Sequence, residues 1–276
     1  MHDFDKRGYL GEGIRQFQES TLASFNQFFT LSKDVCSFAR AKVLQLKWDN
    51  TDGQKVLSCC LFSKILNGVE TTHILSAYGL THEGRVILRS VLEGFFYLKA
   101  TVSDAAFVKE YIQAYELDRL KLMEAATKYK RPPFSDIRKY ATDEVIQAQR
   151  GKIKKQKIEK LNLWNIAQKL GLQDIYDSLY RLLSTDIHTS VRSLEQYMQT
   201  GVTGDVERID WGPQSEDVPQ NLTMGIDTLT RSLECIDNLF AMGIGNELST
   251  YKKQLAAIHQ EYEAKTATEA NTKDEK

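Results

Sequence analysis

Proline, glycine and patterned cysteine are all scarce in this chain. The 276 residues include only 4 prolines and 16 glycines, whereas an all-β protein needs a turn about every ten residues. The scarcity argues against a β-rich fold and favours long helices. The 4 cysteines lie without a Cys-x-x-Cys spacing, which argues against a zinc knuckle or a disulfide framework and predicts buried thiols.

Long apolar runs and an excess of one charge are also missing. No run approaches the roughly 20 apolar residues of a membrane span, and the N-terminal MHDFDKRGYL lacks the apolar core of a signal peptide. The net charge of -1 excludes a globally basic nucleic-acid-binding protein. We therefore expect a soluble, cytoplasmic protein with no membrane partner, in which any contact with nucleic acid is local.

Helical periodicity is present over most of the chain. Hydrophobic residues make up 42% of the sequence, which is enough for a core, and they recur at intervals of three and four. The pattern predicts a single-domain, all-α bundle of about eight helices. The expected helices span residues 14–46, 54–78, 81–102, 104–130, 161–170, 174–198, 221–243 and 247–263. Asp52 or Asn50 is the expected cap of the second helix, which Gly68 should weaken midway and Gly79 should end, and Thr81 is the expected cap of the third.

The predicted organisation has an N-terminal helix, a helical core with an arm and a long loop, and a C-terminal tail. Residues 1–53 form one long helix that packs on the core, and residues 54–263 form the core itself. A polar arm at 134–160 follows the break at Pro132 and Pro133, and a long loop occupies 200–220. Residues 264–276 have no apolar side chain except alanine, so we expect a disordered tail.

The stretch from Arg85 to Lys99 is expected to be the central helix. Its apolar residues fall on every side of a 3.6-residue repeat, which is typical of a buried helix. Arg89 and Glu93 lie one turn apart within it, where charge is tolerated only when it is paired. The sequence therefore predicts a buried polar network of Arg89, Glu93 and the neighbouring Ser90.

A second stretch, DIYDSLYRLLSTDIHTSVRSLEQYM, adds reactive residue types. Arg181, Ser184, His188 and Arg192 are spaced by three, four and four, so they share one helix face. Flanking leucines would bury this helix beside the central one and bring the two polar sets together. Two interpretations stand: a satisfied structural network, or a catalytic site in which His188 is an acid/base.

The stretch RGKIKKQKIEK in the arm is densely cationic. Its side chains form either a solvated helix face or a contact with the RNA backbone. The residues that would make the RNA contact are Arg150, Lys152, Lys154, Lys155 and Lys157.

Metal, cofactor and nucleophilic chemistries lack complete motifs. Glu70 and His73 make one Glu-x-x-His, whereas a ferritin-like di-iron site requires two such motifs and further carboxylates. Ser184 and His188 lack a Gly-x-Ser-x-Gly elbow, and no glycine-rich phosphate loop is present. We expect neither a metal nor a cofactor.

The pairing of LRSVLEGFFYL with YRLLSTDIHTSV resembles a widespread, uncharacterised bacterial helical family. That family carries an Arg-Ser-x-x-Glu helix followed by a Ser-x-x-x-His helix. Arg89, Ser90 and Glu93 fit the first motif, and Ser184 and His188 fit the second. The resemblance covers roughly residues 50–245 and implies no settled activity.

The segment from Arg181 to His188 also resembles the Arg and His motif of HEPN ribonucleases, helical bundles of toxin and antiphage defence systems. That resemblance implies metal-independent RNA cleavage, with His188 as acid/base and Arg181 as a cation, and Arg192 or Arg89 as a second cation. It also implies a homodimer with a composite site, RNA as substrate and a defence-system partner protein. The competing class is a non-catalytic helical scaffold or regulator whose Arg89, Glu93 and His188 network is structural.

Overall fold

The structure is a computed structural model that describes residues 3–129, 132, 134–187, 191–201 and 203–274. It is 77% helical, far above the roughly one-third average of soluble domains. The predicted all-α fold class is therefore confirmed. The described residues contain more helices than the eight expected, because the helix predicted over 14–46 is divided and further helices lie at the N-terminus and in the arm.

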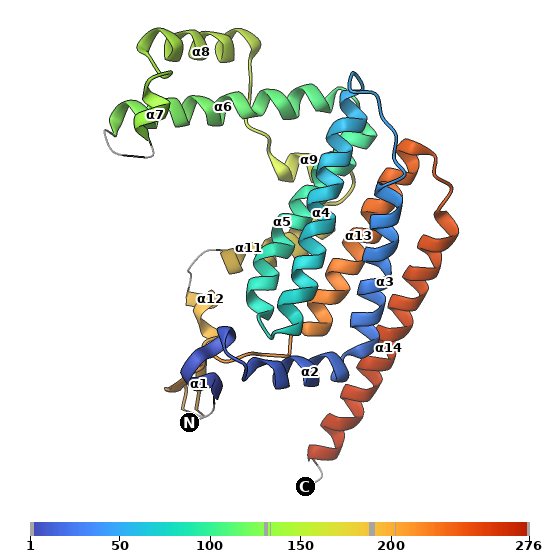
Figure 1. Cartoon of the computed structure of the whole chain (residues 1–276). Coiled ribbons are helices and arrows are strands. Elements are labelled where there is room, and N and C mark those ends of the chain that lie inside the picture. The colour runs from blue at the N-terminus through green and yellow to red at the C-terminus, as the bar shows by residue number, and fades with distance from the viewer. Residues whose placement is uncertain (1–2, 130–131, 133, 188–190, 202, 275–276) are drawn as a thin grey trace.

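Five long helices form the body of the molecule (Figure 1). The helix α5 is central because apolar residues on different sides of it enter two separate clusters. Val91 and Leu98 pack in a cluster with α3, α4 and α13, and Leu88 and Phe96 pack in another with α9 and α11. The five helices are α3 (Asn26–Val43), α4 (Gly53–Ala77), α5 (Thr81–Ser103), α13 (Val218–Phe240) and α14 (Gly245–Asp274).

Local signals in α4 explain its length and its close packing on α5. The Asp52 side chain accepts a hydrogen bond from the Lys55 amide and so caps the helix, as predicted. Gly68 does not interrupt α4: a Cβ there would lie 2.4 Å from Val91 Cγ2, so glycine allows α4 and α5 to approach closely. Gly79, with φ +71°, ends this segment as expected. Thr81 is the first residue of α5, and Leu80 occupies the cap position instead.

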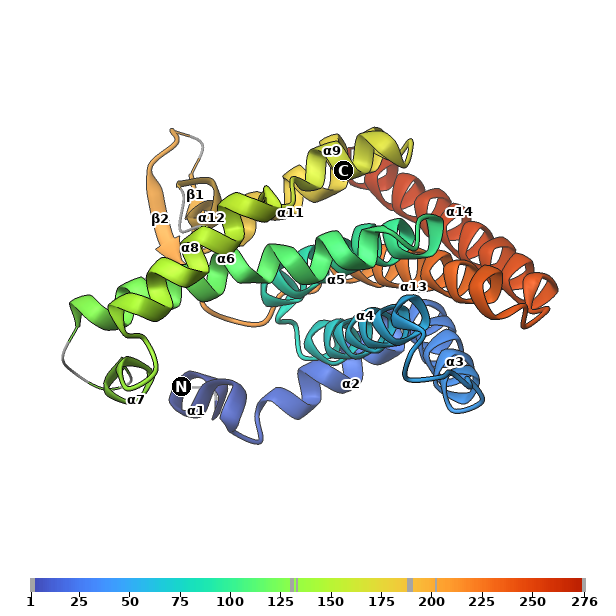
Figure 2. The same cartoon turned by 90° about the horizontal axis from the view of Figure 1, so that it is seen from above.

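The arm projects from one end of the bundle, away from α13 and α14 (Figure 2). It consists of α6 (Phe107–Lys128), α7 (Phe134–Arg138) and α8 (Asp143–Gln156). Its helices share a small apolar cluster that includes Met123 and Ile146. The polar arm predicted at residues 134–160 therefore folds back on α6 and has a core of its own.

The chain returns from the arm to the body through α9 (Leu163–Lys169) and α10 (Gln173–Ile175). The range 174–198, predicted as one α-helix, instead includes a π-helical turn, η2 (Tyr176–Tyr180), before α11 (Arg181–Ile187). The helix α12 (Val191–Glu195) lies beyond residues 188–190. The loop expected at 200–220 contains a short antiparallel hairpin, β1 (Met198–Thr200) with β2 (Val206–Ile209). Met198 pairs with Ile209.

The N-terminal segment differs from the single helix predicted over residues 14–46. The helix α2 (Ile14–Ser24) stops at Phe25, whose φ of -114° and ψ of 28° are not helical, and α3 begins at Asn26. The break turns α2 across the lower end of the bundle (Figure 1). Before it lie α1 (Asp3–Arg7) and the 3₁₀ turn η1 (Gly8–Leu10).

The structure differs from two further expectations, which concern the end of the last helix and the burial of the cysteines. α14 continues as a helix through Asp274, past the end predicted at residue 263, because alanine, glutamate and lysine are good helix formers even where no apolar face is available. Three of the four cysteines are buried thiols as expected, but Cys60 is exposed. No described helix is both long enough and apolar enough to cross a membrane.

Candidate functional site

Four polar residues form a stripe along α5. Arg85, Arg89, Glu93 and Tyr97 follow one another at intervals of four, which places them on one helix face. The stripe faces η2 and the end of α11 on one side and the chain segment before α9 on the other. The sequence analysis identified the two middle members, and the spacing of four would also have identified the outer two.

Arg89 is fixed in place by two neighbours. It forms an ion pair with Glu93, one turn further along α5, and its Cζ lies 4.5 Å from the centre of the Tyr180 ring in a cation–π contact. The Arg89 and Glu93 side chains are 24% and 31% exposed, so the pair is partly open to solvent. The sequence analysis had predicted a buried pair. The Arg89 Nε atom is buried and has no hydrogen-bond partner among the described residues.

An open cavity of about 400 Å³ lies in front of this pair. Burial raises the pKa of the Tyr180 hydroxyl to about 12 and also raises the pKa of Tyr97, to which the Glu93 carboxylate contributes. Both phenols are therefore neutral at pH 7 and can donate hydrogen bonds. The cavity is lined by Arg89, Glu93, Tyr97, Lys160, Leu161, Asn162, Leu163 and Tyr180.

Arg85 makes a different set of contacts one turn earlier. Its Nε donates to Asp186 of α11 at 2.7 Å, and a terminal nitrogen lies 3.4 Å from Asp217 at the start of α13. Beside this group, burial lowers the pKa of His82 in spite of the nearby Asp186 carboxylate. Arg85 thus joins three elements, and the sequence analysis missed both Arg85 and Asp186.

These contacts place α5 and α11 antiparallel. Arg89 meets Tyr180, just before α11, whereas Arg85, one turn earlier on α5, meets Asp186 near the end of α11. Ser184 also lies on this part of α11, but its hydroxyl donates to the Tyr180 carbonyl at 2.7 Å and so belongs to the helix backbone.

The remaining predicted site residues are Arg181, Ser90, Arg192 and His188, and of these Arg181 lies apart from the Arg89 cavity. Arg181 is 68% exposed and pairs with Asp177 on its own helical turn, away from the Arg89 cavity. Ser90 is partly buried next to Arg89. Arg192 belongs to α12, and His188 lies outside the described residues. Of the predicted cluster, the described residues show the Arg89–Glu93 ion pair, while Ser184, one turn beyond Tyr180, bonds within its own helix.

The cationic residues of the arm divide into two groups. Arg150 bonds to Glu124 at 2.6 Å and Lys152 bonds to Glu116 at 2.6 Å, so both are neutralised by α6. The remaining predicted residues, Lys154, Lys155 and Lys157, are exposed and form no ion pair with any described carboxylate.

The Glu-x-x-His pair is committed to structural contacts. Glu70 pairs with Arg40, and His73 Nδ1 lies 3.0 Å from the Ser32 hydroxyl, with its ring edge against Phe29. Burial lowers the pKa of His73. Among the residues with assigned positions, no three His, Cys, Asp or Glu side chains are grouped so that they could hold a metal ion.

The fold and the site define the class of protein. It is an all-α bundle with an Arg–Glu pair on its central helix and a serine-bearing helix beside that helix. Residues 55–205, more than half of the chain, match the model of a family of unknown function, DUF5677. The chain belongs to this family. No curated protein and no solved structure matches it.

Proposed function

We propose that the chain is a HEPN-like, metal-independent RNA-cleaving effector of a toxin or antiphage system. The observation that supports the proposal best is Arg89, a guanidinium fixed by Glu93 and Tyr180 and open to a cavity beside the helix that leads to His188. A positioned cation next to an acid/base group is what RNA cleavage without metal requires. Asp186, two residues before His188, is anchored to α5 through Arg85.

The proposed reaction uses only groups of the chain and the RNA. Neutral His188 accepts the proton of a ribose 2′-hydroxyl, whose oxygen attacks the adjacent phosphorus. The bond to the 5′-oxygen breaks, that oxygen takes up the proton that His188 accepted, and a 2′,3′-cyclic phosphate remains. Arg89 stabilises the charge that develops on the phosphoryl oxygens, with Arg181 or Arg192 as the further cation.

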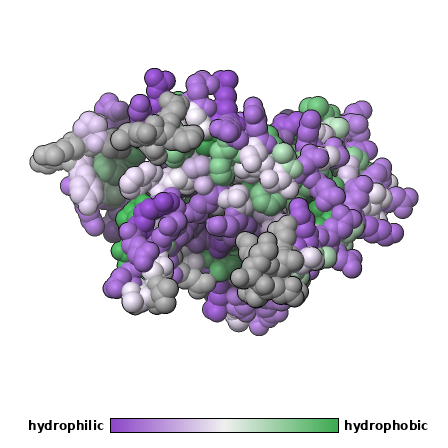
Figure 3. Space-filling view, turned by 90° about the horizontal axis from the view of Figure 1, so that it is seen from below, coloured by the Kyte–Doolittle hydropathy of each residue, from purple (hydrophilic) through white to green (hydrophobic). Residues whose placement is uncertain are grey.

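A second copy of the chain is part of this proposal, because HEPN-like sites are composite. Support comes from apolar side chains that α11 and α12 expose next to each other along the chain. The face of the molecule seen from below is largely hydrophilic, with separate hydrophobic patches (Figure 3), so exposed apolar residues this close together in the sequence are informative. The exposed residues are Leu182, Ile187, Val191 and Leu194.

A non-catalytic scaffold is the competing function, and a specific observation favours it. Arg89 and Arg181 are each already neutralised by a carboxylate one turn away on the same helical segment. In a scaffold these ion pairs would only help to fix the packing of α11 on α5.

The test expresses the wild-type chain, His188→Ala and His259→Ala in a bacterial host and measures growth and total RNA integrity. His259 is the matched control, since it lies on α14 and pairs with Glu263. The proposal expects toxicity and RNA loss from wild type and His259→Ala only, because loss of an acid/base costs about 10²- to 10⁴-fold in rate. Circular dichroism checks that His188→Ala is folded. Harmless expression of all three, with RNA left intact by purified wild type, would leave the scaffold as the function.

A further inference from the structure

A second cavity lies next to the Arg89 cavity. It lies on the other side of residues 157–162, the return segment through which the chain passes from the arm back to the body. It has a volume of about 360 Å³ and lies between α6, which contributes Glu110 and Gln113, and α9, which contributes Asn165 and Lys169. Residues Lys160, Leu161 and Asn162 line both cavities. The two cavities therefore flank one short stretch of chain.

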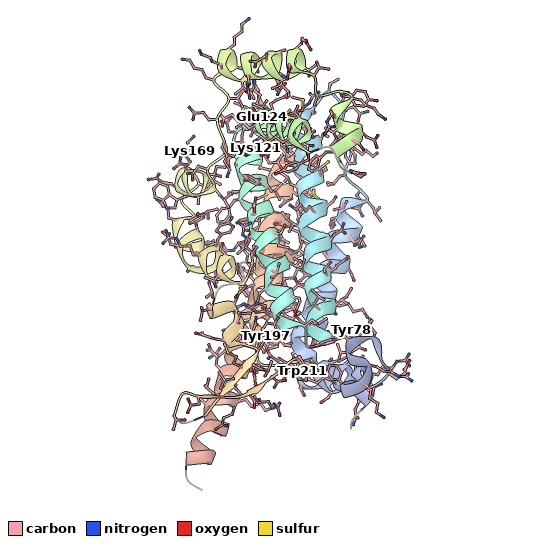
Figure 4. The ribbon with its side chains drawn as sticks, turned by 90° about the vertical axis from the view of Figure 1, so that its left-hand side faces the viewer. Tyr78, Lys121, Glu124, Lys169, Tyr197 and Trp211 are labelled. Carbon is pink, nitrogen blue, oxygen red and sulfur yellow. The ribbon has the colours of Figure 1, made fainter. Side chains whose placement is uncertain are left out.

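Cations without an acidic partner gather along this stretch. Lys157, Lys160 and Lys169 line the second cavity, and none of them forms an ion pair with a described carboxylate. Figure 4 shows Lys169 on α9, below the arm on which Lys121 and Glu124 lie. With Arg89, four cationic side chains border the two cavities, against three carboxylates, those of Glu93, Glu110 and Glu159.

The backbone of the return segment is held at both ends. Lys157 ends α8 in the left-handed conformation, with φ 50°, and the Ile158 amide bonds back to the Ile153 carbonyl. At the other end the Asn162 side-chain oxygen accepts from the Asn165 amide and caps α9. That bond uses the oxygen of Asn162 and leaves its NH₂ group as a donor beside Lys160.

Aromatic and cation–π contacts cover the ring of Tyr180 and one face of Tyr97 in the Arg89 cavity. Tyr180 is stacked on Tyr176 at a centroid distance of 4.9 Å and carries Arg89 over its ring. Tyr97 stacks on Phe107, with an interplanar angle of 23°. Tyr180 therefore has no free ring face on which a nucleic-acid base could stack, and Tyr97 has one face fewer for this purpose.

We infer that the two cavities bind successive phosphates of single-stranded RNA, one at Arg89 and Lys160 and the next at Lys157 and Lys169. Donor groups without stacking surfaces bind the backbone and do not select bases. A single strand can bend over the narrow segment at residues 160–162, whereas a stiff A-form duplex cannot enter cavities on both sides of it. This inference rests on the proposed function, since it identifies single-stranded RNA as the substrate class.

The test measures binding of fluorescein-labelled oligouridylates by anisotropy, in the His188→Ala background so that the probe is not cleaved. Lys157→Ala/Lys169→Ala and Lys160→Ala are compared with Lys64→Ala/Lys253→Ala, which removes the same charge as the first pair from exposed positions of α4 and α14 outside both cavities. We expect the cavity pair to weaken binding about tenfold and to lower the slope of log affinity against log salt by about 1 to 2, and the control pair to change little.

Probe length gives an independent reading. If the two cavities bind successive phosphates (the two-phosphate track), affinity should rise from uridine monophosphate to a tetranucleotide. A duplex of equal length should compete poorly. Equal losses in the cavity pair and the control pair, or a monophosphate that binds as tightly as the tetranucleotide, would overturn the inference. RNA degradation that still depends on His188 would then show that the proposed function stands without the track. Binding by a wild type that cleaves nothing would instead retain the track and reject the nuclease.

Discussion

Arg85 and Arg89 lie one turn apart on the same face of α5, yet their surroundings give them different roles. Arg85 reaches out of its helix to carboxylates at the end of α11 and the start of α13. Arg89 is paired within its own helix and faces a cavity. A charge that ties separate elements together is committed to the fold, whereas a charge held within one element in a cavity remains available to a ligand.

Loss of the Arg85 contact should have the largest effect on stability. Asp186 is 9% exposed, and Arg85 is 17% exposed, so Asp186→Ala leaves a mostly buried guanidinium with Asp217 at 3.4 Å as its remaining partner. We expect the free energy of unfolding to fall by about 3 kcal/mol. Urea denaturation followed by circular dichroism measures this loss.

A double-mutant cycle sharpens the comparison. Arg85→Met combined with Asp186→Ala removes both charges, and the double variant should recover part of the loss, because no buried charge is left unpaired. Strictly additive losses would mean that Arg85 and Asp186 are not coupled, and the contrast with Arg89 would then lose its basis.

Removal of Arg89 should cost much less. Since the Arg89 and Glu93 side chains are 24% and 31% exposed, solvent screens their attraction, and Arg89→Gln should lower the free energy of unfolding by about 1 kcal/mol. The same denaturation experiment checks the value. A loss as large as that of Asp186→Ala would show that Arg89 is a structural residue, which would favour the scaffold.

The fold could be predicted from the sequence where helical periodicity is long and continuous. The apolar pattern on all sides of α5 was enough to identify the central helix, and Asp52 and Gly79 identified the ends of α4. The break at Phe25 could not be predicted, because the apolar spacing continues across it and only tertiary packing turns α2 away from α3. The hairpin after α12 is short and exposed, so it leaves little trace in an apolar pattern.

The candidate site was predicted in part, for a related reason. A charged pair within one helix, such as Arg89 and Glu93, is visible as a spacing of four. The partner of Arg85 lies 101 positions away at Asp186, and no local pattern indicates such a pairing. Arg181 was expected to face α5 because helical spacing was extended through the whole segment, but the π-helical turn η2 precedes it and its side chain faces solvent.

Substitution of Arg181 should have the smallest effect on stability. Its effect on activity therefore tests most directly which arginine is the catalytic cation. Arg181 is 68% exposed, and its partner Asp177, at 3.4 Å, is 48% exposed, so Arg181→Ala should change the free energy of unfolding by less than about 0.5 kcal/mol. Any loss of toxicity or RNA cleavage in this variant therefore reports on function and not on folding. If Arg181→Ala abolishes activity, the cation of the Arg and His motif acts at the RNA, which requires the exposed face of α11 to meet the substrate or a second chain. If it leaves activity intact while Arg89→Gln removes it, the catalytic cation is the one in the cavity on α5.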